Sequence, residues 1–165
     1  MVGQAETRWL DAKREPPAND LEFAKDVAAM ANTGQAGLLV YGFSNRKTQN
    51  GDQIAGLKPF HGKAMRPPPL QKHLLKVLRP RPMGVEIEVV NVAPGHSVGY
   101  VYVPAHESAR LPLMFNGVRI DGKVRESFVA IPVRVGEETY WEDATTIHGL
   151  LAAGRAALHG STSSV

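Results

Sequence analysis

A helix, a glycine turn and a buried strand follow one another between residues 19 and 41, and this order constrains the fold more than any other feature. Asn19 is placed to cap the helix, because Glu22 stands three residues later in the spacing of a capping box. The pattern predicts a helix over about residues 20–32 that packs closely on a sheet, and a central strand over residues 38–41. Small apolar residues recur at helical intervals in that helix: Leu21, Ala24, Val27, Ala28 and Ala31.

The turn between this helix and this strand reads Asn32-Thr33-Gly34. We interpret it as structural: Asn32 and Thr33 end the helix, and Gly34 takes a positive φ angle that suits glycine. Residues 34–37 lack the Gly-Lys-Ser/Thr of a nucleotide-binding P-loop, so the chain carries no motif for ATP binding here.

The rest of the chain predicts short strands and two further helices. Residues 85–103 favour an antiparallel hairpin, residues 44–52 a polar hairpin-like loop, and residues 104–116 a loop. The mixture predicts a single α+β domain over residues 1–159, with about three helices packed on a mixed β-sheet, and a disordered tail at 160–165. Strands are expected over 8–13, 54–57, 85–89, 99–103 and 128–135, and helices over about 70–78 and 145–158.

Composition excludes several kinds of site. The chain has no cysteine, so it has neither a disulfide framework nor a cysteine-based zinc site. The six histidines show no ligand spacing on a shared helix, so a zinc site is not expected. The N-terminus lacks the apolar segment of a secretory signal, and no apolar run is long enough to span a bilayer. A cytoplasmic protein without membrane association is the default expectation.

The positive charge is concentrated in one segment. Residues 58–82 carry seven of the nineteen cations and no acidic residue, whereas the rest of the chain carries twelve cations against sixteen anions. Such a block is suited to face phosphates, and a solvated helix with its flanking loops explains it equally well. We call these seven residues the basic block: Lys58, Lys63, Arg66, Lys72, Lys76, Arg79 and Arg81.

Several motifs together resemble the AlbA_2 family, also called the Schlafen AlbA_2 or divergent AAA_4 domain. They are Trp9-Leu10-Asp11-Ala12-Lys13, the helix ending in Ala31-Asn32-Thr33, the glycine turn, the strand ending in Gly42, and Gly51-Asp52 with Gly56. A later segment, residues 131–139, is similar to a family element that precedes a helix. The resemblance covers about residues 6–151 and implies an α+β fold and a nucleic-acid-binding domain.

The departures from the family pattern concern catalysis. In the Schlafen branch three acidic residues make a metal-dependent endoribonuclease that acts on tRNA and rRNA. Glu6 and Asp11 have a spacing similar to the first two acids, but Ser44-Asn45 stand where relatives carry carboxylates. Asp52 would have to supply the third, with Mg²⁺ or Mn²⁺ as the metal. The alternative is that Glu6 is solvated, Asp11 pairs with Lys13 or an arginine, and Asp52 caps a turn.

We therefore expect a nucleic-acid-binding domain that contacts DNA or RNA phosphates through the basic block, with Lys13 and Arg14 near the motif face. Lys13 can instead pair with a carboxylate. No cofactor is expected with certainty, and Mg²⁺ or Mn²⁺ only if the chain is a nuclease. Two alternatives stay open: the endoribonuclease with Glu6, Asp11 and Asp52, and an interaction or homo-oligomerisation module. Glu137, Glu138, Glu142 and Asp143 are interpreted as a solvated loop and a helix N-terminus.

Overall fold

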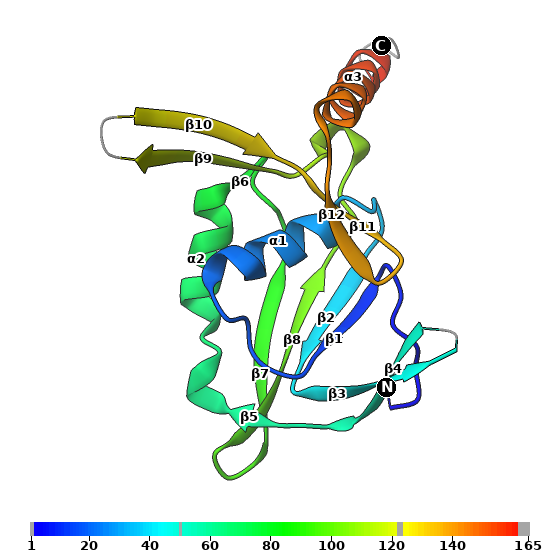
Figure 1. The fold of residues 1–165 in the computed structure, drawn as a ribbon, viewed down its shortest axis with the longest axis vertical. Coiled ribbons are helices and arrows are strands. Elements are labelled where there is room, and N and C mark those ends of the chain that lie inside the picture. Colours follow the sequence, from blue (N-terminus) through cyan, green and yellow to red (C-terminus); the bar gives the residue numbers. More distant parts are fainter. Residues whose placement is uncertain (1, 50, 122–123, 162–165) are drawn as a thin grey trace.

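A computed structural model describes residues 2–49, 51–121 and 124–161. At its centre is a five-stranded sheet in which β1 (Leu10–Lys13) runs parallel to β2 (Gly37–Tyr41), and β2 pairs with β8 (His96–Val103) in antiparallel fashion. Strands β7 (Glu86–Ala93) and β5 (Phe60–His61) also pair antiparallel with β8. The sheet is mixed, which confirms the predicted α+β class (Figure 1).

Helix α1 (Asp20–Ala31) connects the parallel strands β1 and β2 and lies across one face of the sheet (Figure 1). Its predicted cap is confirmed, since the Asn19 side chain accepts a hydrogen bond from the Glu22 amide. Helix α2 (Pro67–Val77) packs beside α1. Gly37 lets α1 approach β2, because a Cβ there would lie 2.2 Å from Sδ of Met30. The core between helices and sheet includes Phe23, Val27, Met30, Leu39, Leu74 and Val101.

A hairpin of β3 (Phe43–Thr48) and β4 (Gly51–Leu57) covers part of the other face. Phe43 and Ile54 of this hairpin pack with Ala12 and Val40 of the sheet. The polar hairpin-like loop predicted over residues 44–52 is a β-hairpin, but most of its residues belong to the paired strands β3 and β4. The sequence did not show these strands, because β3 is polar along most of its length and therefore carries no hydrophobic alternation. Its exposed residues 45–48 pair with β4 through the backbone.

The C-terminal third forms two further hairpins and a helix. Strand β9 (Met114–Asp121) pairs with β10 (Val124–Ala130) and with β6 (Leu78–Arg79), β11 (Pro132–Val135) pairs with β12 (Glu138–Trp141), and helix α3 (Ala144–Ser161) follows. The β9–β10 hairpin and α3 extend away from the sheet (Figure 1). Short 3₁₀ turns occupy Gly62–Ala64 and Ser108–Arg110.

Two expectations for this region need correction. The strand predicted over residues 128–135 is divided at Ile131, whose side chain is buried and whose carbonyl accepts a hydrogen bond from the Glu142 amide instead of joining a ladder. The loop expected over residues 104–116 gives way to β9 at Met114. Of the expected tail, residues 160–161 belong to α3 and residues 162–165 lie outside the described part of the chain.

None of the helices in the described residues combines the length and the apolar character that crossing a membrane would require.

Candidate carboxylate cluster and phosphate-facing surface

The carboxylate of Asp11 is buried on β1 between two cations. Its Oδ2 lies 3.1 Å from Nζ of Lys13 and 3.2 Å from Nη1 of Arg134, whose side chain is also buried on β11. Of the two readings of Asp11, the pairing with Lys13 and an arginine is the one that this geometry shows. A buried carboxylate compensated by two cations is strongly held in the fold, and it is not among the acids that converge at the surface.

Glu6 lies against Asn45, the residue that stands where nuclease relatives carry acid. The Asn45 amide Nδ2 donates to Oε1 of Glu6 at 2.7 Å and to the carbonyl of Ala12 at 2.8 Å. The Ala12 amide donates to the same Glu6 oxygen at 2.7 Å. Burial raises the pKa of Glu6 above its ordinary value, and these donors offset the shift only in part. The residues that stand where nuclease relatives carry their acids therefore do not fit a metal ion. Asn45 presents an amide N–H there, and the charge of Asp11 is compensated by Lys13 and Arg134.

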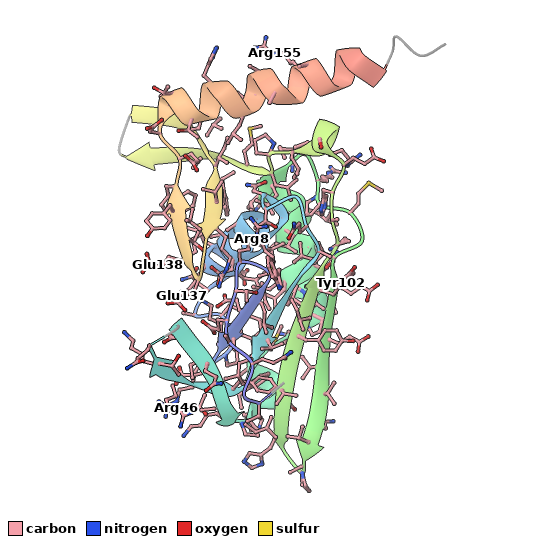
Figure 2. All side chains as sticks on the ribbon, turned by 90° about the vertical axis from the view of Figure 1, so that its right-hand side faces the viewer. Arg8, Arg46, Tyr102, Glu137, Glu138 and Arg155 are labelled. Carbon is pink, nitrogen blue, oxygen red and sulfur yellow. The ribbon has the colours of Figure 1, made fainter. Side chains whose placement is uncertain are left out.

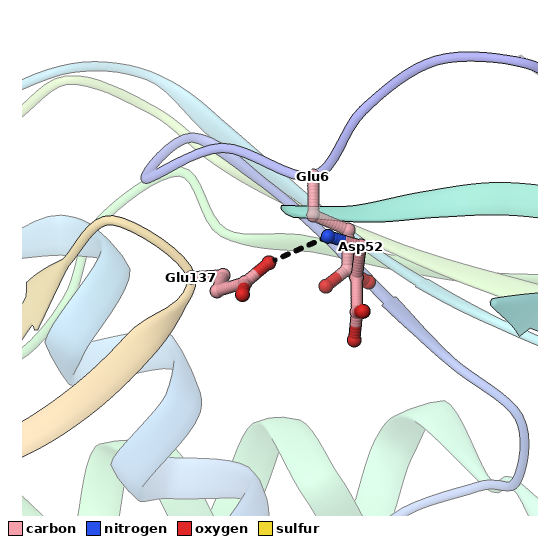
Figure 3. Close-up of side chains that lie close together, drawn as sticks. All are labelled: Glu6, Asp52 and Glu137. Carbon is pink, nitrogen blue, oxygen red and sulfur yellow. Dashed lines mark hydrogen bonds between the residues drawn. The ribbon is translucent and has the colours of Figure 1, made fainter. Parts of the chain in front are cut away.

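A different set of acids does converge. Glu6, Asp52 and Glu137 each place a ligand oxygen so that all three oxygens lie within 4.8 Å of one another (Figure 3). Glu137 comes from the turn between β11 and β12, and its Oε2 accepts a hydrogen bond of 3.0 Å from the Asp52 amide. Figure 2 shows Glu137 at the tip of that hairpin, facing the β3–β4 hairpin that carries Arg46. Three carboxylates at this spacing are suited to hard divalent cations such as Mg²⁺ or Mn²⁺.

Of the three predicted acids, the structure brings Glu6 and Asp52 together, and Glu137 takes the place expected for Asp11. The solvated loop predicted for Glu137 describes its exposure but not its position beside Asp52. The residue that precedes it, Gly136, has a φ of 63° and forms the turn that directs the hairpin back toward β4. The only available signal was this Gly136-Glu137 turn between two short alternating strands, and the contact it makes spans 85 residues of sequence.

Lys13 is held by acidic residues on two elements. Its Nζ lies 3.1 Å from Asp11 and 3.9 Å from Asp26 of α1, and Asp26 in turn lies 3.5 Å from Nζ of Lys25. Burial lowers the pKa of Lys13, but attraction by Asp11 and Asp26 outweighs burial, so the net shift is upward. Burial raises the pKa of Asp26 despite both lysines. The alternative that Lys13 pairs with carboxylates is the one that the structure contains.

The basic block is exposed along its whole length. Part of it surrounds the loop of residues 14–19: Arg14, Lys58 and Phe60 line one cavity of about 440 Å³ beside Pro16 and Pro17. A neighbouring cavity of about 220 Å³, which shares Pro17 with the first, is lined by Lys63 and Arg66 together with Asp20. The remaining members follow on α2 and after it: Lys72, Lys76, Arg79 and Arg81.

Its charges are largely free to meet a ligand. Within the described residues, no ion pair joins a member of the block to an acidic group. Arg79 is oriented by the protein backbone, since its Nη1 donates to the carbonyls of Leu75 and Leu78 at 3.0 and 2.7 Å. The cations of the block are therefore exposed and are not held in ion pairs with acids among the described residues, although Glu15 and Asp20 line the two cavities beside them.

The Asn32-Thr33-Gly34 turn holds three parts of the chain together. Asn32 Nδ2 donates to the carbonyls of Leu113 and Pro132 at 2.9 and 2.8 Å, and its Oδ1 accepts from the Leu113 amide at 2.6 Å. Thr33 Oγ1 donates to the Met30 carbonyl at 2.8 Å, and Gly34 has the expected positive φ of 74°. These contacts account for the turn without a ligand.

An apolar hollow of about 300 Å³ lies on the sheet face that the β3–β4 hairpin leaves uncovered. Val90 and Val92 of the neighbouring strand β7 are also about half exposed. The interaction-module alternative depends on this surface, and it stays a prediction because the structure does not show what covers it. The hollow is lined by Leu38, Val40, Phe43, Val98, Gly99 and Tyr100.

Residues 6–140 match the family model described as Schlafen, AlbA_2, so the chain belongs to the Schlafen AlbA_2 family. No curated protein matches it. Among solved structures, it is similar to the solution NMR structure of the N-terminal domain of a RecG-related protein from Nitrosomonas europaea, with 21% sequence identity and a TM-score of 0.47. That similarity covers 72% of this chain and 77% of the other.

Proposed function

We propose that this domain binds nucleic acid by contacting its phosphates with the basic block. The observation that carries the proposal is the exposure of all seven cations of a segment that contains no acid, on a domain of a family that is associated with nucleic acid. Arg14 extends the surface, because it lines the same cavity as Lys58. Lys13 contributes less to the phosphate-binding surface than the sequence suggests, because Asp11 and Asp26 compensate the charge of its ammonium group.

Contacts of this kind have a defined energetic signature. Each phosphate that a cation neutralises releases counterions, so the logarithm of the binding constant falls by roughly 0.9 for each contact per tenfold increase in salt on duplex DNA. Phosphate contacts fix the position of the strand and carry no sequence information. Binding by the basic block is therefore expected to be strongly salt-dependent and similar for different sequences.

The test is charge reversal on the exposed face of α2 and just after it. The triple substitution Lys72→Glu, Lys76→Glu and Arg79→Glu should weaken binding to labelled duplex DNA, single-stranded DNA and tRNA alike, and should make the salt slope shallower by roughly three. Fluorescence anisotropy over a salt series measures both. The matched control, Arg8→Glu, Arg46→Glu and Lys47→Glu, makes the same change in net charge away from the block. If the two triple variants change affinity and salt slope equally, the basic block is only a solvated face and not a binding surface.

The carboxylate cluster favours a second candidate, metal-dependent cleavage of RNA. Glu6, Asp52 and Glu137 would hold the ion, which would supply positive charge for the attacked phosphate and an activated water. The replacement of the family's acid by Asn45 argues for slow or absent cleavage at the family's own position.

Incubation of tRNA with Mn²⁺, followed by gel analysis, tests this second candidate. Discrete fragments that disappear in Asp52→Asn and persist in Glu138→Gln would establish cleavage at the cluster. Fragments that disappear in Asp11→Ala but persist in Asp52→Asn would assign cleavage to the family position instead. Intact tRNA under all conditions would leave phosphate binding as the activity of the domain.

A further inference from the structure

A polar cavity of about 310 Å³ opens where the carboxyl ends of β1 and β2 meet the first half of α1. Lys13 ends β1, Tyr41 ends β2, and Asp26 reaches the cavity from α1. Two further acids also line it, Glu22 from α1 and Glu15 from the loop after β1. Pro16 and Pro17 form an apolar edge on the connecting loop. Parallel strands joined by a helix commonly bind ligands outside their carboxyl ends, and this volume falls at the lower end of the range for small-molecule sites, roughly 300–1,000 Å³.

The cavity contains buried polar groups that the protein does not fully satisfy. Tyr41 is only 1% exposed, and its hydroxyl has no hydrogen-bond partner among the described residues. Burial, then Asp26 and Asp11, raise the pKa of Tyr41 well above its ordinary value, so the hydroxyl keeps its proton. Asp26 is 4% exposed, and its two lysine partners stand at 3.5 and 3.9 Å, longer than a charge-assisted hydrogen bond of roughly 2.7–2.9 Å. Native proteins seldom leave a buried hydroxyl such as that of Tyr41 without a partner.

We propose that this cavity binds the guanine base of an unpaired nucleotide, an inference that rests on the proposed nucleic-acid binding and specifies one of its ligands. The Watson–Crick edge of guanine offers two adjacent donors, N1–H and the 2-amino group, beside one acceptor, O6. A carboxylate accepts from both donors at once. Asp26 takes that pair, Lys13 donates to O6, and the hydroxyl of Tyr41 gains a partner at the same edge.

The other bases do not match this set of groups. Adenine and cytosine each present a single amino group beside a ring nitrogen that is an acceptor, and this lone pair would face the Asp26 carboxylate. Uracil and thymine present one N–H between two carbonyls, which would do the same. Discrimination is therefore expected from Asp26, because a mismatched base brings an acceptor lone pair against a buried carboxylate.

The position of the cavity also suits a nucleotide within a strand. Arg14 and Glu15 both line this cavity and the neighbouring cavity that contains Lys58. A base in the first cavity would place its phosphate near Arg14, at the start of the basic surface. Pro16 and Pro17 separate the two cavities and line both of them, so they can contact the face of the base.

Isothermal titration with the four ribonucleoside 5′-monophosphates tests the inference without requiring the extended basic surface. GMP should bind at least tenfold more tightly than AMP, CMP or UMP. Asp26→Asn should remove this preference, because the asparagine amide presents a donor to a donor, and Tyr41→Phe should reduce GMP affinity several-fold. Glu86→Gln, which neutralises an exposed acid on β7, is the control that should change nothing.

The results separate the two proposals. Equal affinity for the four nucleotides, or a GMP preference that survives in Asp26→Asn, would overturn the guanine site, whatever the basic block does. A GMP preference in a protein whose strand binding is unaffected by charge reversal of α2 would support the cavity and refute the phosphate surface. Tyr41→Phe keeps the buried ring, so it provides a folded variant if Asp26→Asn does not fold.

Discussion

Replacement of Asn32 by alanine tests whether the family's Asn-Thr turn stabilises the fold or contacts a ligand. The substitution removes three hydrogen bonds, two to the backbone of Leu113 and one to the carbonyl of Pro132. It leaves one N–H and two carbonyls without partners in a half-buried position. At a net value of about 0.5–1.5 kcal/mol for each bond, the expected loss is about 3 kcal/mol of unfolding free energy.

The loss should be visible in simple denaturation experiments. For a domain of this size each kcal/mol shifts Tm by roughly 2–4 °C, so Asn32→Ala should lower Tm by roughly 6–12 °C. Thermal and urea denaturation followed by circular dichroism measure both quantities. Thr33→Ala is the comparison, because it removes the bond to the Met30 carbonyl and the bond from the Gln35 amide, and it should cost about 1–2 kcal/mol. A stability change below about 1 kcal/mol in Asn32→Ala, with nucleic-acid binding lost, would refute the structural interpretation.

Two further substitutions test local backbone and charge arguments. Gly34→Val should lower the unfolding free energy by about 1 kcal/mol or more, because the φ of 74° at this position is unfavourable for valine. The cost lies in the backbone and not in a clash, since the nearest side-chain atom to a new Cβ, on Leu111, is 4.0 Å away. An unchanged midpoint of urea denaturation would contradict this prediction. Arg134→Met should cost about 3 kcal/mol, because it leaves buried Asp11 with Lys13 alone, and Asp11→Asn in the same background should recover part of that loss in a double-mutant cycle.

The parts of the fold that the sequence predicted are those that local chemistry specifies. The Asn19 cap and the apolar spacing of residues 21–31 define α1 within one continuous segment, and Gly34 defines the turn after it. The hairpin of β7 and β8 is marked by alternation and by the turn at residues 94–95. Each of these signals acts between residues a few positions apart, so it can be read from the chain directly.

The parts that the sequence did not predict depend on contacts between distant segments. Arg134 neutralises Asp11 across 123 positions, and Glu137 reaches the Asp52 amide across 85. Both come from the β11–β12 hairpin. The sequence predicts β11 only as the end of a strand over residues 128–135 and places Glu137 in a solvated loop beyond it, so the prediction does not bring Glu137 back toward β4.

The buried carboxylate of Asp26 gives a prediction whose sign depends on pH. Burial raises its pKa in the folded protein even with Lys13 and Lys25 nearby, so ionisation is less favourable in the fold than in the unfolded chain. The stability associated with this group is complete below its ordinary pKa of 3.8 and is lost as the pH rises through its higher folded pKa.

Asp26→Asn, which cannot ionise, should therefore be more stable than the natural protein at pH 7, and the difference should disappear toward pH 3.5. Urea denaturation of both proteins between pH 3.5 and 7.5 measures the difference. If the excess stability of Asp26→Asn over the natural protein shrinks as the pH rises, the two lysines stabilise the Asp26 anion more than burial destabilises it. Asp26 is then an ordinary ion-pair partner. If the advantage grows, the fold retains a carboxylate that costs stability at neutral pH. That result would support the use of the Asp26 charge by a ligand, which is the role we propose for it in the guanine cavity.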